Sequence, residues 1–280
     1  GIFHISDMFT DPGDCVVVPD LFWGNYRLIF VERQRNELVT FPFYTDAGGF
    51  NAGGLAKALK GRKKAVVLLN FPNNPTGYSP TAGEADEITA VLVNAAENGT
   101  DLLVICDDAY FDLFYEDNIY KHSLFSQLAT AHENILAVKV DGPTKEDFCW
   151  GFRIGFVTFG SKGLGETHYN ALNQKLLGAI RSSISSCSRP AQSLLIRALN
   201  DPEYKRQKAA LREELHDRYR AVKDLLAGKE CAPLTVLPFN SGYFMSFAFP
   251  GKAETLRVKL LDDYQIGTIS FQDDYLRVTY

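Results

Sequence analysis

Residues 65–77 read Ala-Val-Val-Leu-Leu-Asn-Phe-Pro-Asn-Asn-Pro-Thr-Gly, an apolar run that passes directly into a polar turn. The apolar residues 65–69 predict a buried β-strand, because short apolar runs bounded by turn residues are typical of strands covered on both faces. Residues 81–98 predict a helix with an acidic first turn, and residues 102–106 predict the next strand. Strand, helix and strand in this order indicate a parallel sheet.

The same alternation continues on both sides of this unit. Further strands are predicted at 15–18, 38–42, 135–140 and 152–159, and helices at 2–9, 26–31, 55–64, 166–184 and 191–226, the last broken at 200–202. The charged residues 205–220 suggest a long exposed connector. After Gly228, strands are predicted at 234–237, 243–249 and 276–280, with a helix at 254–261.

We therefore expect an α/β fold, in which a mostly parallel mixed sheet is flanked by helices, followed by a smaller α+β C-terminal domain. Residues 1–195 are predicted to form the large domain, and residues 196–280 the connector helix and the small domain. The chain begins on a helical pattern without an initiator Met and ends on a strand-like run. We expect both domains to be incomplete, the first at its N-terminal part and the second at its C-terminal part.

Composition excludes several classes of partner. The net charge of -5 argues against nucleic acid and against an anionic membrane. No apolar run reaches the ~18 residues that a membrane helix needs, and no signal peptide is visible. The five cysteines form no close pair, so neither a disulfide framework nor a metal site is predicted. We expect a cytoplasmic protein with reduced thiols.

Polar residues follow three of the predicted strands. Asn73-Asn74, Asp107-Asp108 and Thr144-Lys145 come after the strands at 65–69, 102–106 and 135–140. In open α/β sheets ligands bind beyond the carboxyl ends of the strands, so these residues are candidates for one site. Taken singly, each has an ordinary alternative: a solvated surface lysine, an aspartate that caps a helix, and an Asn-Pro turn.

The order of these motifs along the chain is more specific than any one of them. Asn74-Pro75-Thr76-Gly77, Asp107-x-Ala109-Tyr110, Thr144-Lys145 and Arg153-x-Gly155 follow one another in the sequence. This series resembles the class I aminotransferases, enzymes of pyridoxal phosphate (PLP) fold type I. The resemblance extends from Gly13-Asp14 to Arg277 and implies a large PLP-binding domain.

The resemblance implies a role for each residue around the cofactor ring. Lys145 would be the Schiff-base lysine and would also move the proton during catalysis. Asp107 would pair with the pyridinium nitrogen, and Tyr110 and Asn74 would hydrogen-bond the phenolic oxygen. Trp23 matches the aromatic residue that stacks on the ring, with a core tryptophan as the alternative.

It also implies contacts to the phosphate and the substrate. Arg153 would bind the phosphate bidentately and Thr144 would add a hydroxyl. Arg277 matches the arginine that binds the substrate α-carboxylate, and Asn74 is implied as a further substrate-binding residue. Residues 240–244 match the strand that faces the site. Arg181 resembles the arginine that selects dicarboxylate substrates, although a structural arginine at a helix C-terminus is the alternative. The family usually has Ser three residues before the lysine, where this chain has Gly142.

The function implied is transfer of an amino group from an amino acid to a 2-oxo acid, with aspartate and glutamate as candidate donors. A homodimer is implied too, because sites of this family lie between two subunits. Two alternatives stay open. One is another PLP reaction on the same fold, by a β-lyase, decarboxylase or synthase. The other is a non-catalytic or regulatory aminotransferase-like domain.

Overall fold

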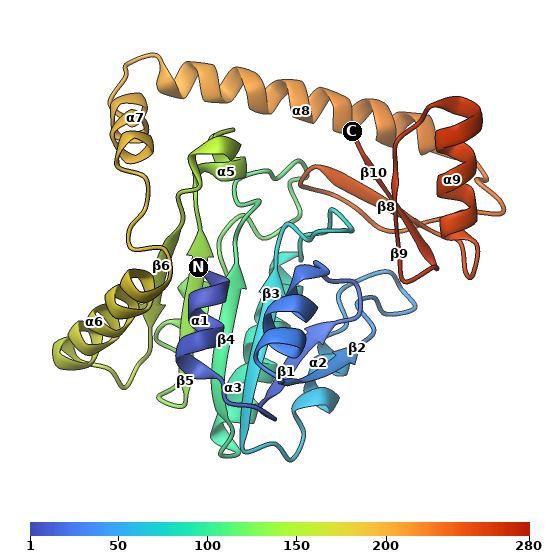
Figure 1. The fold of residues 1–280 in the computed structure, drawn as a ribbon. Helices are drawn as coiled ribbons and strands as arrows, with labels where there is room; N and C mark the ends of the chain where they lie inside the picture. The colour runs from blue at the N-terminus through green and yellow to red at the C-terminus, as the bar shows by residue number, and fades with distance from the viewer.

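The computed structural model describes residues 1–280 and contains two β-sheets (Figure 1). The larger sheet has the strand order β2-β1-β3-β4-β5-β6, and only β6 runs antiparallel to its neighbour. This mixed, mostly parallel sheet confirms the predicted fold class. Its strands are β1 (Cys15–Pro19), β2 (Glu37–Phe41), β3 (Lys64–Asn70), β4 (Asp101–Asp107), β5 (Ile135–Asp141) and β6 (Phe156–Gly160).

Side chains of the central strands alternate between two apolar clusters on opposite faces of the sheet. Val17 and Val67 pack in one cluster with α2 (Ala52–Leu59) and α3 (Ala82–Glu97). Val16 and Val66 pack in the other with α1 (Ile2–Phe9) and the π-helical segment η1 (Arg27–Arg33). Because successive side chains of a strand point to opposite faces, an apolar run such as 65–69 supplies both clusters.

The predicted helix at 81–98 begins and ends where the sequence indicates. The Thr81 side chain accepts a hydrogen bond from the Glu84 backbone N–H, and the Glu84 carboxylate accepts one from the Thr81 N–H. This capping box satisfies two backbone donors that the helix itself leaves free. It fixes the start of α3 and with it the connection from β3 to β4.

The second sheet follows the long helix α8 (Tyr204–Leu226) in the chain; in Figure 1 this helix crosses the top of the molecule and the sheet lies below its C-terminal end. Its strand order is β7-β8-β10-β9, and every neighbouring pair is antiparallel. The helix α9 (Ala253–Tyr264) accompanies it. The strands are β7 (Thr235–Val236), β8 (Phe244–Ala248), β9 (Ile269–Phe271) and β10 (Tyr275–Thr279).

The structure contains the long charged helix and the break before it that the sequence predicts. The predicted break at 200–202 separates α7 (Arg189–Leu199) from α8, and Tyr219 alone is buried among the residues of α8. The helix α6 (Glu166–Ser183) ends one residue before the predicted limit. The proposed domain boundary at residue 195 falls inside α7, and the division stays a prediction. No helix combines the length and the apolar character needed to cross a bilayer.

Other predicted boundaries were wrong. The helix expected at 55–64 is α2, which ends at Leu59, because Lys64 already pairs with Asp101 in the sheet. The strand expected from residue 152 begins at Phe156, because a 3-10 turn, η2 (Trp150–Phe152), precedes it and Arg153 adopts a left-handed φ of 53°. The strand β9 and the short helices α4 (Phe125–Leu128) and α5 (Pro143–Glu146) were not predicted.

Candidate active site

A pocket of about 420 Å³ opens at the carboxyl ends of β3, β4 and β5. The last residue of each of these strands, Asn70, Asp107 and Asp141, lines it. A pocket of this size lies within the range of small-molecule sites. Seven of the nine predicted site residues line it as well: Trp23, Asn74, Asp107, Tyr110, Thr144, Lys145 and Arg153.

Asn70 holds the wall of the pocket that follows β3. Its side-chain amide donates to the Asp107 carbonyl at 2.7 Å, and its Oδ1 accepts from the Asn74 backbone N–H at 2.8 Å. Gly77 completes this turn with φ 72°, and a Cβ there would lie 1.8 Å from the Phe244 carbonyl oxygen. Glycine is therefore required where β8 of the second sheet approaches the turn.

Asp107 presents a carboxylate fixed from behind by two hydrogen bonds. The Tyr26 hydroxyl donates to Oδ2, and the Ala109 backbone N–H donates to Oδ1 at 3.2 Å. Burial raises the pKa of Asp107, and the hydrogen bonds from Tyr26 and Ala109 act against that rise. The carboxyl group is thus held in the pocket wall at a fixed place.

Lys145 enters the pocket from α5, directly after β5. Burial lowers the pKa of its ammonium group and the nearby Arg153 lowers it further, while Asp107 opposes both. Its Nζ lies 5.2 Å from the centre of the Tyr110 ring and forms no hydrogen bond or ion pair. A lysine with a lowered pKa and an unpaired amine is suited to act as a nucleophile or a base.

Tyr110 and Asn74 link the pocket to the second sheet. The Asn74 amide donates to the Tyr110 hydroxyl at 3.4 Å, and the Asn74 Oδ1 accepts from the Arg277 guanidinium at 2.7 Å. Burial raises the pKa of Tyr110 to about 12, so the phenol is protonated and available as a donor at neutral pH. Arg277 belongs to β10 and lies 4.3 Å over the Phe244 ring. It does not line the pocket, but it reaches the pocket through Asn74.

The opposite side of the pocket offers donors for an anion. Thr144 contributes a hydroxyl and Arg153 an exposed guanidinium, which also donates to the Trp150 carbonyl at 3.3 Å. A Cβ on Gly142 would lie 2.7 Å from the Ile154 carbonyl oxygen. A serine, which the family pattern usually has here, therefore would not fit without a backbone shift. The close approach of the end of β5 to residue 154 explains the departure.

Arg181 lies apart from these residues. It is exposed near the end of α6, where its guanidinium donates to the Ser185 hydroxyl just beyond the helix. It does not line the pocket of this chain. This contact agrees with the alternative of a structural arginine at a helix C-terminus, and a role in substrate binding stays a prediction.

Two residues of the site were not singled out in the sequence. Asn70 stands at the last position of β3, where its polar side chain after five apolar residues was the available signal. Tyr26 was assigned only to a predicted helix, and its partner Asp107 is 81 positions away. Nothing in the local sequence of Tyr26 indicates that contact.

The donor set fits PLP, the cofactor that the resemblance implies. An unpaired amine, a carboxylate, a phenol–amide pair and a guanidinium with a hydroxyl line a single pocket, with the Trp23 indole in its wall. These are the groups that a phosphorylated pyridine aldehyde requires.

Comparison with known proteins gives the same family. The family model for aminotransferase class I and II matches residues 1–280. The chain is 30% identical over 230 residues to an LL-diaminopimelate aminotransferase of Desulforudis audaxviator, covering 81% of this chain and 51% of that protein. It is 30% identical over 229 residues to an aspartate/prephenate aminotransferase of Thermus thermophilus, covering 80% of this chain and 52% of that protein.

A solved structure extends the likeness to the whole chain. The crystal structure of an aminotransferase from Anaerococcus prevotii matches with a TM-score of 0.85 and 27% identity, over 99% of this chain and 68% of that chain. The chain spans about half the length of the curated relatives it matches. With the family model matched from the first residue to the last, the chain belongs to the aminotransferase class I and II family.

Proposed function

We propose that the complete protein transfers an amino group from an amino acid to a 2-oxo acid, with PLP as its cofactor. The observation that carries this proposal is the shared pocket of Lys145 and Asp107, which Asn74 connects to Arg277. Class I and II aminotransferases use PLP. When bound, PLP supplies an aldehyde carbon that takes up the amino group and a ring that withdraws electrons from the reacting bond.

Residues on two sides of the pocket would hold the cofactor. Asp107, kept in place by Tyr26, would accept a hydrogen bond from a protonated ring nitrogen. Tyr110 and Asn74 would donate to the phenolic oxygen of the cofactor, and Trp23 would lie against the face of its ring. Thr144 and Arg153 would bind the phosphate, for which a guanidinium is well suited.

Lys145 would carry the proton transfer. Because burial lowers the pKa of its amine, a larger share of Lys145 is neutral than for an exposed lysine at the same pH. A neutral Nζ removes a proton from the Cα of the amino acid as a general base. The donor amino acid leaves as a 2-oxo acid. The acceptor 2-oxo acid then becomes the new amino acid by the same steps in reverse.

Arg277 would select the substrate class by binding the α-carboxylate. Burial lowers the pKa of its guanidinium, and Asn74 Oδ1 is its hydrogen-bond partner. An arginine is charged throughout the physiological range, and a half-buried one with a neutral partner favours a carboxylate ligand. Among donors we favour aspartate, because relatives named aspartate aminotransferase and aspartate/prephenate aminotransferase are similar to this chain.

We infer that the complete protein is a homodimer. Large apolar side chains are exposed on α6 (Leu177), directly after it (Ile184) and on α7 (Leu194, Ile196 and Leu199). An apolar surface of this kind commonly marks a contact with another protein. A second copy of the chain would cover it, as expected for the family.

The proposal is tested with a panel of amino acids and a 2-oxo acid acceptor. We expect a new amino acid to form from the acceptor at the rate at which the donor is consumed, measured by chromatography of the complete protein with PLP. Release of CO₂ from the donor would indicate a decarboxylase instead. Loss of a β-substituent without a new amino acid would indicate a lyase. No turnover of any donor, with PLP bound, would favour a regulatory domain.

The same panel tests Arg181. If Arg181 of a second subunit contacts the donor side chain, Arg181→Ala should lower kcat/KM for aspartate by about 10²-fold, because the bidentate carboxylate contact is lost. The rate with alanine should be unchanged. Arg197→Ala, which replaces an arginine of α7, serves as the control. An unchanged preference for aspartate in Arg181→Ala would leave Arg181 as a helix-end residue.

A further inference from the structure

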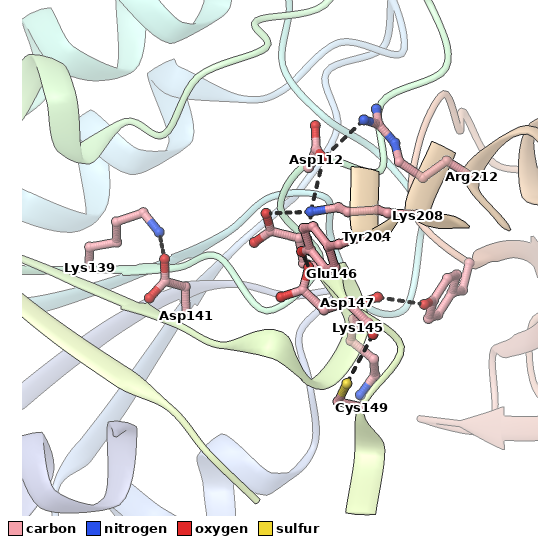
Figure 2. Close-up of polar contacts among 11 residues, drawn as sticks. Asp112, Lys139, Asp141, Lys145, Glu146, Asp147, Cys149, Tyr204, Lys208 and Arg212 are labelled. Atoms are coloured by element: carbon pink, nitrogen blue, oxygen red, sulfur yellow. Dashed lines mark hydrogen bonds and ion pairs between the residues drawn. The ribbon is translucent and has the colours of Figure 1, made fainter. Parts of the chain in front are cut away.

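A charged cluster connects α8 to the turn that carries Lys145 (Figure 2). We call it the Lys208 cluster: Lys208, Arg212, Asp112, Glu146 and Asp147. The Lys208 Nζ lies 2.9 Å from Glu146 Oε1, 3.1 Å from Asp147 Oδ1 and 3.6 Å from Asp112 Oδ2. Arg212 lies 3.0 Å from the same Asp112 oxygen. One ammonium group thus bridges three carboxylates.

Lys208 and Asp147, at the centre of the cluster, are largely shielded from solvent, whereas the side chains of Glu146, Asp112 and Arg212 are 28%, 30% and 37% exposed. The side chains of Lys208 and Asp147 are 16% and 12% exposed, whereas Arg206 and Glu203 of the neighbouring ion pair are 74% and 52% exposed. The Tyr204 hydroxyl also donates to Asp147. Burial lowers the pKa of Lys208, but its hydrogen bonds to Glu146 and Asp147 outweigh burial and hold the pKa above its usual value. Lys208 is therefore charged, and its contacts are screened less than those of a surface pair.

The three carboxylates belong to the two segments that carry the candidate catalytic groups. Glu146 and Asp147 directly follow Lys145, and Asp112 follows Tyr110 by two positions. In Figure 2 the Lys145 side chain points away from the cluster, while Glu146 and Asp147 face α8. The Lys145 carbonyl accepts a hydrogen bond from Tyr243 at 3.1 Å. Contacts thus hold the backbone of the turn and leave the Lys145 amine free.

The turn is short, and its internal support is limited to local contacts such as the backbone hydrogen bonds from Asp147 and Cys149 to the Pro143 carbonyl. The helix α5 spans four residues, and Phe148 and Arg153 after it adopt left-handed φ values of 57° and 53°. Isolated helices of this length are not stable, and left-handed non-glycine residues persist only where surrounding contacts impose them. The place of Lys145 in the pocket must therefore be imposed by tertiary contacts, and the Lys208 cluster is the charged contact at this turn.

We propose that Lys208 is a positioning residue that holds the Lys145 turn and the Tyr110 segment in their places relative to one another. The proposal deepens the proposed function, since it rests on the role of Lys145 in that function. Removing Lys208 leaves three carboxylates with Arg212 as their remaining cation. Repulsion among them would displace residues 144–149 from α8. A displacement on the order of 1 Å at a reacting group can cost up to about 10²-fold in rate.

The test compares Lys208→Met with Arg206→Met, which removes the exposed ion pair to Glu203 on the same helix. The first readout is hydrogen exchange of the backbone amides of residues 144–149 in the complete protein without PLP. We expect about tenfold faster exchange in Lys208→Met and no change in Arg206→Met. This readout does not need activity, so its failure is distinct from failure of the proposed function.

The second readout is kinetic, with PLP and an amino donor. Lys208→Met should lower kcat by about tenfold and leave the KM for the donor within about twofold, because the Arg277 contact is intact. Lys208→Arg keeps the charge and should restore most of the loss. Lys208→Met/Glu146→Gln should recover part of it, because one of the repelling carboxylates is neutral.

Two results would overturn the proposal. One is exchange of residues 144–149 in Lys208→Met that equals wild type. The other is faster exchange that extends equally to β3 and β4, since it would mean a general loss of stability. If Lys208→Met does not fold, Glu146→Gln carries the same test: local acceleration in residues 144–149 supports the proposal, and its absence contradicts it.

Discussion

Replacement of Lys145 by alanine should abolish amino transfer, lowering kcat by at least about 10³-fold, because general acid–base catalysis alone contributes roughly 10²–10⁴-fold. The variant loses the lysine of the pocket, whose Nζ is free of hydrogen bonds and ion pairs and whose pKa burial lowers. No other lysine lines the pocket and could replace it. The measurement is the steady-state rate of amino transfer with saturating PLP.

Lys121→Ala is the matched control for this variant. Lys121 pairs with Asp117 at 2.9 Å on the surface and does not line the pocket. Its removal should leave kcat within about twofold of wild type, as is usual for exposed ion pairs. Lys145→Ala retaining a tenth or more of the wild-type rate would refute the assigned role.

Asp107→Asn should lower kcat by at least about 10²-fold, in line with loss of a preorganised electrostatic partner. The amide keeps the size of the side chain, and its oxygen can still accept from Tyr26, although the hydrogen bond from the Ala109 N–H is lost. The variant also loses the negative charge, which favours a protonated ring nitrogen most strongly as electrons move into the ring. Affinity for PLP should fall much less than kcat, and comparing the two in a titration and a rate assay checks this difference.

Asp101→Asn serves as the control for Asp107→Asn. Asp101 is the first residue of the same strand and is exposed at the end of the strand opposite Asp107. It should leave both kcat and PLP affinity unchanged. Near-normal turnover in Asp107→Asn, or an equal loss of affinity and kcat, would contradict the electrostatic role.

Much of the large sheet could be predicted because its strands are short apolar runs bounded by turn residues. Residues 65–69 and 102–106 lie at the centre of the sheet, and the polar residues after them meet in one pocket. This follows from geometry, since the carboxyl ends of neighbouring parallel strands share one edge of the sheet. Asn74, Asp107 and Lys145 were accessible to sequence reasoning for this reason.

The contacts that fix those residues were less accessible. Tyr26 and Lys208 meet Asp107 and Asp147 across 81 and 61 positions, and pairing over such distances leaves no local pattern. The charged residues 205–220 indicated an exposed helix, and this holds for Arg206 but not for Lys208. Which charges of a uniformly charged helix face the protein depends on how the helix docks.

The boundaries that were missed share a cause in backbone geometry. The strand β6 begins later than predicted because Arg153 has a left-handed backbone conformation. This conformation is uncommon for residues other than glycine and cannot be predicted from the local sequence here. The strand β9 has three residues and acquires its strand character only by pairing with β10. Such elements are set by tertiary contacts rather than by local preference.

The covalent attachment of PLP tests the central claim most directly. The complete protein is incubated with PLP, reduced with borohydride, digested and mapped by mass spectrometry. We predict a phosphopyridoxyl adduct on the peptide that contains Lys145, absent from Lys145→Ala and retained in Lys121→Ala. An adduct confined to another lysine, or retained in Lys145→Ala, would contradict the account.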